Sequence, residues 1–164
     1  LPQPVIAEVC GIAAAAGCQL VASCDLAVAS DQSSFMTPGV NIGLFCSTPM
    51  VAVSRNISRK KIMEMLLTGE KLSAQEAVQF GLINKCVPLK RLHVDTLNLA
   101  KLIASKPTST VKIGKEAFYK QVEMSLDDAY NYTSEVMAIN MMEIDAHEGI
   151  SAFLDKRTPS WNEK

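Results

Sequence analysis

The stretch Pro4–Ser30, PVIAEVCGIAAAAGCQLVASCDLAVAS, constrains the fold more than any other part of the chain. Its β-branched run, Val5–Val9, predicts a strand that stops at Gly11. Its small residues, Ala13–Gly17, predict the start of a helix, and a second strand is expected from Leu26 onward. The order strand, helix, strand is typical of an α/β protein.

The small residues at this helix start also bear on function. A helix start presents unpaired backbone N–H groups and the positive end of the helix dipole, and Ala and Gly let another molecule approach that backbone closely. Such a place can hold a carbonyl oxygen as it gains negative charge. Tight packing of a helix on a sheet also requires small residues, so the spacing alone leaves both explanations open.

Composition limits the classes of partner. The chain has 164 residues, of which 48% are apolar, and a net charge of −1. This is enough apolar material for a substantial core in one domain, or in a small domain with an appendage. The near-neutral charge gives no electrostatic argument for nucleic acid or an anionic membrane. Glu8 and Gln19 interrupt the apolar stretches, so no membrane span is expected.

Cysteine and histidine residues give no metal-binding pattern. The five cysteines contain no CxxC pair and are dispersed through apolar segments, which predicts buried free thiols in a reducing compartment. His93 and His147 lie in polar, helical segments and are expected at the surface. No metal and no separate cofactor are therefore expected.

The middle of the chain carries clear helix boundaries. Ser58 begins a helix that Gly69 ends, and Ser73 and Glu76 form a capping box for a helix that ends at Gly81. The other expected elements are a loop over Phe35–Gly43, a helix over 46–56 and a strand over 83–87 that Pro88 closes.

From Leu89 onward the pattern predicts helices only. Ser125 and Asp128 are expected to cap one of them. The expected apolar stripes are Leu92, Leu99 and Ile103; Ile113, Ala117 and Val122; Leu126, Ala129, Val136 and Met137; and Ile150, Phe153 and Leu154. This wide apolar surface indicates that the helices pack on more than their own core.

Three motifs resemble one family. The opening stretch resembles the enoyl-CoA hydratase/isomerase (crotonase) signature PVIAAVNG-x-A-x-GGGCELA-x-x-CD. MEMLLTGEKLSAQEAVQFGLINKCVP is similar to the family's MEM-x-LTG-x-x-x-SAQ-A-x-x-GLV-x-x-V-x-P, and EGISAFLDKRTPSW to EG-x-x-AF-x-EKR-x-P-x-F. The motifs follow in family order and spacing over nearly the whole chain.

The resemblance implies an α/β fold in two parts. Residues 1–88 would be the C-terminal part of a crotonase-like ββα spiral core, and residues 89–164 an all-helical oligomerisation region that forms homotrimers or hexamers. It also implies that the sequence is the C-terminal part of a longer protein. The missing N-terminal segment would carry any targeting peptide, the first oxyanion-hole donor and much of the CoA-binding loop.

The resemblance places unusual residues at the family's two catalytic glutamates. Family hydratases use an oxyanion hole and two carboxylates that hold and deprotonate water. Carried onto this chain, the first glutamate becomes Gln19 and the second becomes Gly39. The aspartate that dienoyl-CoA isomerases use becomes Ser47. Gln can orient a water but cannot accept its proton, and Gly offers only backbone, so no catalytic residue is assigned and no hydratase activity is expected.

Binding of an acyl-CoA thioester is nevertheless expected. The family's backbone oxyanion donor corresponds to Ala16, with Gly17 and Gln19 beside it. Phe153 and Lys156 correspond to residues that lie near CoA in the family, and Arg157 would also suit its phosphates. A solvated helix end with its apolar stripe in the core is the alternative for these last three residues.

The remaining polar candidates are weaker. Cys18 and Cys46 flank the expected pocket and could act as nucleophiles, but no basic partner is near in sequence, which favours inert core thiols. Ser47 and Thr48 could orient a ligand, or could simply be solvated. Asp25 matches the family's Cys-Asp pair and is interpreted as structural.

Two functions remain open at this point. The first is an acyl-CoA-binding protein of fatty-acid metabolism without hydratase activity. The second is an active isomerase, thioesterase or decarboxylase that uses the oxyanion hole and a group from the missing segment. A weaker third possibility is a shortened form that acts only through its helical surface. The mitochondrial matrix is the expected location, with peroxisome or cytosol as alternatives, although the C-terminus is not an SKL-type signal.

Overall fold

A computed structural model describes residues 1–162 and divides the chain into two compact units. We call Val5–Ala100 the spiral unit, and Leu1–Pro4 together with the chain from Lys101 onward the helical unit. Only helical elements follow Leu89, but the spiral unit extends to Ala100, within helix α5 (Leu92–Ala104). The division therefore differs from the boundary expected at residue 88, because the first turns of α5, including the buried Leu92, belong to the spiral unit.

The strands of the spiral unit form two small sheets. One is parallel, with the order β1 (Ile6–Val9), β3 (Leu26–Ser30) and β6 (Lys85–Val87). The other contains β2 (Ile12–Ala14), β4 (Ser34–Met36) and β5 (Leu72–Ser73), with β2 parallel and β5 antiparallel to β4. Strands β1 to β4 alternate between the two sheets, β5 joins β4 in the second sheet, and β6 returns to the first. Helix α1 (Ala16–Ser23) lies between β2 and β3 in the chain, and α4 (Ala74–Phe80) lies between β5 and β6. This winding confirms the ββα spiral expected from the sequence.

Helix α1 (Ala16–Ser23) follows strand β2. The prediction that the helix begins at Ala13 was wrong, since Ala13 pairs with Phe35 in the second sheet. Ala13 is buried and Phe35 is fully buried. Sheet pairing and burial here override the helix propensity of alanine.

The chain after β3 is more ordered than expected. Part of the predicted loop over 35–43 is strand β4, and Pro38–Ile42 forms the 3-10 helix η1. The helix expected over 46–56 is only the short α2, Pro49–Val53. It begins at a proline, whose missing N–H is not needed in the first turn.

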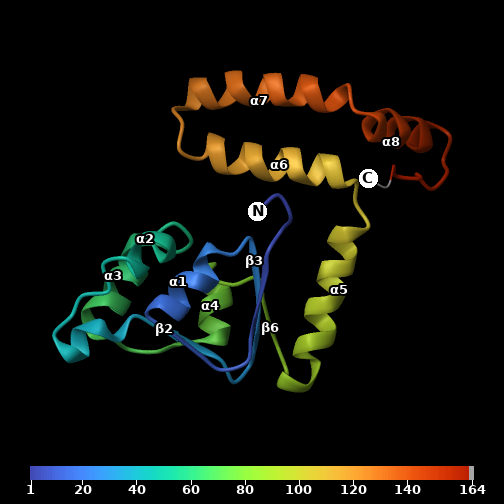
Figure 1. Ribbon diagram of the computed structural model, residues 1–164. Helices are drawn as coiled ribbons and strands as arrows, with labels where there is room; N and C mark the ends of the chain where they lie inside the picture. The colour runs from blue at the N-terminus through green and yellow to red at the C-terminus, as the bar shows by residue number, and fades with distance from the viewer. Residues whose placement is uncertain (163–164) are drawn as a thin grey trace. The chain divides into compact units, whose positions relative to one another are not determined.

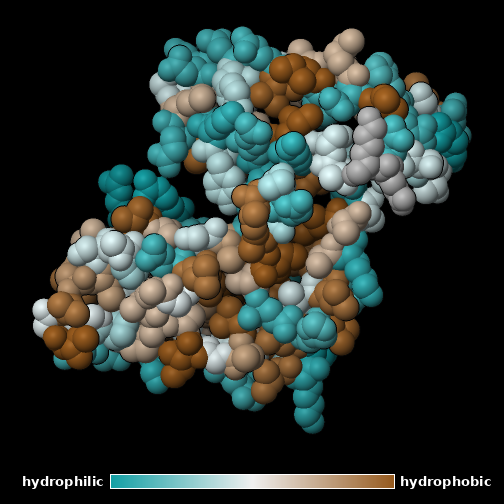
Figure 2. All heavy atoms as spheres, in the orientation of Figure 1, coloured by the Kyte–Doolittle hydropathy of each residue, from teal (hydrophilic) through white to brown (hydrophobic). Residues whose placement is uncertain are grey.

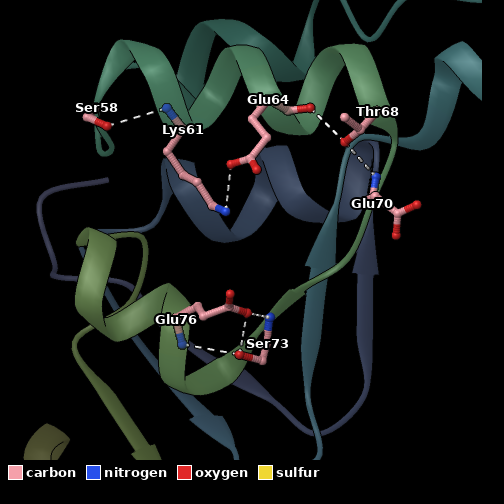
Figure 3. A network of polar contacts seen from close by, with 7 residues as sticks. All are labelled: Ser58, Lys61, Glu64, Thr68, Glu70, Ser73 and Glu76. Carbon is pink, nitrogen blue, oxygen red and sulfur yellow. Dashed lines mark hydrogen bonds and ion pairs between the residues drawn. The ribbon is translucent and has the colours of Figure 1, made fainter.

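Both helix boundaries expected in the middle of the chain are confirmed. In α3 (Arg59–Thr68) the Ser58 hydroxyl accepts the Lys61 N–H, and Gly69 ends the helix with a φ of 66°. In α4 (Ala74–Phe80) the Ser73 hydroxyl accepts the Glu76 N–H while the Glu76 carboxylate accepts the Ser73 N–H at 2.9 Å. Figure 3 shows these contacts on the two helices. The hydrogen bonds from Ser73 lower the pKa of Glu76.

The spiral unit has a closed apolar core. Side chains from both sheets and from α1, α2 and α3 pack together in it. Its largest fully buried side chains include Phe35, Leu72, Val28 and Val53. This core holds the turn between β2 and α1 in place.

The helical unit contains α6 (Thr108–Gln121), α7 (Leu126–Met141) and α8 (Ile144–Leu154). Helices α6 and α7 lie side by side, and Ser125 caps α7 as expected (Figure 1). The expected apolar stripes are largely exposed here. Ala117 and Ala129 are buried, but Val122, Leu126, Met137, Ile150, Phe153 and Leu154 are all exposed. No helix within residues 1–162 has the length and apolar composition needed to cross a membrane.

Candidate active site

A cavity of about 590 Å³ opens in the spiral unit where α1 begins. Two segments line it, the β2–α1 turn and the stretch from η1 to α2. The lining residues are Ala15, Ala16, Pro38, Gly39, Asn41, Ile42, Leu44, Phe45, Cys46, Ser47, Thr48 and Pro49. None of these twelve side chains carries a formal charge at neutral pH, so the cavity suits an apolar group.

Ala15 is the turn residue that points the start of α1 toward the cavity. Its φ of 47° and ψ of −113° lie in a region that an L-residue rarely adopts. Its N–H donates to the carbonyl of Met36 at 3.0 Å, which ties the turn to β4. The family pattern quoted above has glycine at this position, and glycine adopts a positive φ without strain. This substitution of alanine for glycine was the signal in the sequence for the strained backbone.

Ala16 is the position to which the resemblance assigns an oxyanion donor. It is the first residue of α1, is exposed, and lines the cavity. The N–H groups in the first turn of a helix have no acceptor within the helix and carry the positive end of its dipole. A thioester oxygen entering the cavity can therefore accept a hydrogen bond at this helix start.

Gln19 and Gly17 are not among the cavity-lining residues. Gln19 is half-buried, and its N–H donates to the Ala15 carbonyl at 3.0 Å as part of the first helical turn. Gly17 is exposed. Of the residues singled out in α1, the structure thus brings only Ala16 to the cavity wall.

Gly39 lines the cavity with its backbone, and it has no room for a side chain. An ideal Cβ at this position would lie 2.9 Å from Cys46 Sγ and 2.9 Å from the Leu44 carbonyl oxygen. The Gly39 N–H donates to Cys46 Sγ at 3.3 Å, and the Leu44 N–H donates to the Gly39 carbonyl at 2.9 Å. The segment 44–46 is therefore folded back against Gly39 and fills the space of its absent side chain.

The two cysteines near the cavity differ in their surroundings. Burial raises the pKa of the Cys18 thiol to about 11, opposed by a hydrogen bond from the Met36 backbone and reinforced by Cys46. Cys18 is fully buried and stays protonated at neutral pH, which fits an inert core thiol. Cys46 lines the cavity and is also buried. Cys10, in contrast, is exposed, so the expectation of five buried thiols was wrong at that residue, and Cys24 and Cys86 are only half-buried.

Phe153 and Lys156 belong to the helical unit, and their expected contact with CoA stays a prediction. Phe153 is 82% exposed in α8. Lys156 follows the helix with a φ of 55°. Its N–H donates to the Phe153 carbonyl and the Arg157 N–H to the Ala152 carbonyl, the pattern of a Schellman cap in which glycine is usual.

Arg157 is engaged within the helical unit. Its guanidinium makes two hydrogen bonds to Glu148, at 2.7 and 2.9 Å, and lies 3.5 Å from Asp155. The Ser160 N–H donates to the same Glu148 carboxylate at 2.8 Å. These bonds lower the pKa of Glu148 to about 2 and raise that of Arg157. Glu148 and Arg157, both in the motif EGISAFLDKRTPSW, thus hold the segment after α8 against the helix. Because Arg157 is already paired with Glu148, its surroundings do not support the suggestion that it binds CoA phosphates.

The histidines do not gather into a site. His93 Nδ1 lies 3.3 Å from a Glu8 carboxylate oxygen at the surface, and His147 is exposed. Within the described residues, no three His, Cys, Asp or Glu side chains are placed to hold a metal ion.

Comparison with known proteins extends the resemblance. The family model "Enoyl-CoA hydratase/isomerase" matches residues 1–164. The chain is 57% identical over 161 residues to the human protein named "Enoyl-CoA hydratase domain-containing protein 3, mitochondrial", covering 98% of this chain and 53% of that protein. It is 34% identical to a "Probable enoyl-CoA hydratase, mitochondrial" of Dictyostelium discoideum, covering 99% of this chain and 59% of that protein.

Solved structures agree with this assignment. An enoyl-CoA hydratase of Mycobacterium smegmatis superposes with a TM-score of 0.97 at 52% identity, over 98% of this chain and 63% of that one. The human domain-containing protein 3 superposes with a TM-score of 0.95 at 57% identity, with the same coverage. The chain spans about half the length of the curated relatives named here. On the motifs, the fold and these matches, the chain belongs to the enoyl-CoA hydratase/isomerase family.

Proposed function

We propose that this protein binds acyl-CoA thioesters and does not hydrate them. The cavity beside α1 takes the acyl group, and the N–H groups at the start of α1, with that of Ala16 foremost, hold the thioester oxygen. Mitochondrial fatty-acid metabolism is the proposed setting, because the similar proteins from human, mouse and rat carry mitochondrial names.

The closed space at Gly39 is the observation that carries this proposal. By the resemblance, position 39 is where a hydratase places a catalytic glutamate. Cys46 Sγ and the Leu44 carbonyl lie within 2.9 Å of the place where a side chain would begin. A carboxylate at position 39 therefore requires segment 44–46 to move away.

The residue at position 19 supports the same conclusion. Gln19 can donate and accept hydrogen bonds but cannot take a proton from water near neutral pH. A positioned general acid or base typically contributes a factor of about 10²–10⁴ to a rate. Without either carboxylate, the oxyanion donor alone stabilises the bound thioester but leaves the attacking water unactivated.

The proposal also assigns binding of the CoA part of the ligand to Lys156 and Phe153. Lys156 is exposed and has an ammonium group that suits a phosphate, and Phe153 offers an exposed ring. The exposed apolar faces of α7 and α8 favour self-association over a monomer. The resemblance implies that the assembly is a homotrimer or hexamer.

The test is a paired assay on the full-length protein that contains this chain. Crotonyl-CoA hydration is followed by loss of enoyl absorbance, and acyl-CoA binding by calorimetry in the same preparation. We expect binding without measurable hydration. Hydration at ordinary enzyme rates would contradict the proposal, and would favour the alternative of an active enzyme that draws its acid–base group from outside residues 1–164.

The contacts around Gly39 guide the design of variants that would gain hydratase activity. Gln19→Glu with Gly39→Glu is expected to fail, because the new side chain meets Cys46 and Leu44. Adding Cys46→Gly removes the sulfur, one of the two groups nearest to the new side chain, and we expect this triple variant to gain hydration activity. Gln19→Glu with Cys46→Gly, without a carboxylate at position 39, is the matched control.

A further inference from the structure

Two groups close the wall of the cavity beside Gly39, and one of them is a side chain, that of Cys46. Cys46 is 7% exposed, its Sγ accepts the Gly39 N–H at 3.3 Å, and it lines the cavity. The space for a Cβ at position 39 is filled by the Cys46 sulfur and the Leu44 carbonyl. Among these two groups, only the cysteine side chain can be removed by substitution. Cys46 is therefore the side chain through which the extent of the cavity on this side can be changed.

The charge of the lining limits what can enter. The cavity offers Asn41, Ser47 and Thr48 as polar side chains, and its other nine residues are apolar, glycine or cysteine. No lysine, arginine or histidine lies in this lining to pair with an anion. A carboxylate taken into such a site loses its water and gains no opposite charge, whereas a methyl group gains from burial.

We propose that Cys46 is a specificity-determining residue of this cavity: its thiol closes the space beside Gly39, so that the site takes uncharged aliphatic acyl groups of limited bulk. This inference rests on the proposed function, because it concerns the acyl part of the same thioester ligand. It adds two statements to that proposal. An acyl group ending in a carboxylate is excluded, and the size limit is set at Cys46.

Butyryl-CoA and succinyl-CoA test the first statement, since both carry four acyl carbons and differ at the end of the chain. On the full-length protein we expect calorimetry to show succinyl-CoA binding at least tenfold more weakly than butyryl-CoA. Equal affinities would overturn the exclusion of charged acyl groups while leaving the proposed function intact. If neither thioester binds, both the proposed function and this inference are overturned.

Cys46→Ala tests the second statement. Removing the sulfur enlarges the cavity beside Gly39, and octanoyl-CoA should gain affinity relative to butyryl-CoA by about tenfold, the size expected for a change of this order in an apolar pocket. Cys10→Ala makes the same substitution at an exposed cysteine that does not line the cavity, and should leave the ratio unchanged. An unchanged ratio in Cys46→Ala would overturn the assignment.

A second pair of variants keeps the test informative if Cys46→Ala is poorly folded. Gly39→Ala should weaken butyryl-CoA binding because its methyl group meets Cys46 Sγ at 2.9 Å. Adding Cys46→Gly to Gly39→Ala should recover part of the loss. If the double variant binds no better than Gly39→Ala, the sulfur is not the group that closes this wall.

Discussion

The spiral unit and the helical unit bury their side chains in opposite ways. In the spiral unit large apolar side chains such as Phe35, Leu72 and Val53 are almost completely inaccessible. Between the start of α6 and residue 162 the buried residues are Ala117, Ala129, Ala152 and Asp145, while Phe118, Tyr130, Met142 and Leu154 remain exposed. Figure 2 shows hydrophobic atoms at the surface of both units.

This difference separates two roles within one chain. A unit with a core of its own can hold a strained turn such as the one at Ala15 and keep a cavity open beside it. Helices that expose long apolar side chains are stabilised fully only when another surface covers them. Binding of the acyl group is therefore proposed for the spiral unit, and self-association for the helical unit.

The helical unit also contains an apolar hollow of about 450 Å³. Met137, Met141, Ile150, Phe153 and Leu154 contribute to its lining. Asp145 is buried near them, where its carboxylate accepts the Asn162 N–H at 2.8 Å. The hollow adds apolar area to the surface on which the proposed self-association depends.

The largest expected effect contrasts two phenylalanines. Phe35→Ala removes a fully buried ring from the spiral core and should lower the free energy of unfolding by about 3–5 kcal/mol. Phe153→Ala changes a ring that is 82% exposed and should have little effect on this chain at low protein concentration. Urea denaturation followed by circular dichroism measures both. An equal loss in the two variants would break the contrast between the units.

A smaller effect is expected at the cap of α8. Lys156 has a φ of 55°, so Lys156→Gly should raise the free energy of unfolding by about 1 kcal/mol by removing backbone strain. Lys156→Ala keeps a Cβ in the same conformation and should show no such gain. If the ammonium group binds CoA phosphates as proposed, both variants should lose affinity for acyl-CoA, which separates its two roles.

The smallest expected effect is a pH dependence at Glu148. The bonds from Arg157 and Ser160 hold the pKa of this carboxyl near 2, below its ordinary value of 4.5. The charged form is therefore the one that the fold favours, and its contribution is complete above about pH 4.5 and is lost as the pH falls toward 2. Carboxyl titration by NMR should show this low pKa, and Glu148→Gln should have a flatter stability profile in that range. A pKa near 4.5 would mean that the pair with Arg157 does not persist in solution.

Local sequence determined the helix ends best. The capping box at Ser73 and Glu76 and the glycine ends at Gly69 and Gly81 are all present, because each depends on residues a few positions apart. The prediction of where α1 begins was less accurate. Ala13 has helix propensity, but its partner across the sheet is Phe35, and that pairing is not visible locally.

The candidate site shows the same limit. The sequence by itself determined the family and the small residues at the start of α1. It also placed Gln19 and Gly39 at the two positions to which the resemblance assigns the family's glutamates. Only the tertiary structure decided that Gln19 is not part of the cavity lining, that Arg157 pairs with Glu148, and that Cys46 fills the space beside Gly39. The physical reason is that a glycine such as Gly39 leaves space beside the backbone, and the sequence does not show what fills that space. Here the segment 44–46 folds back and places Cys46 there.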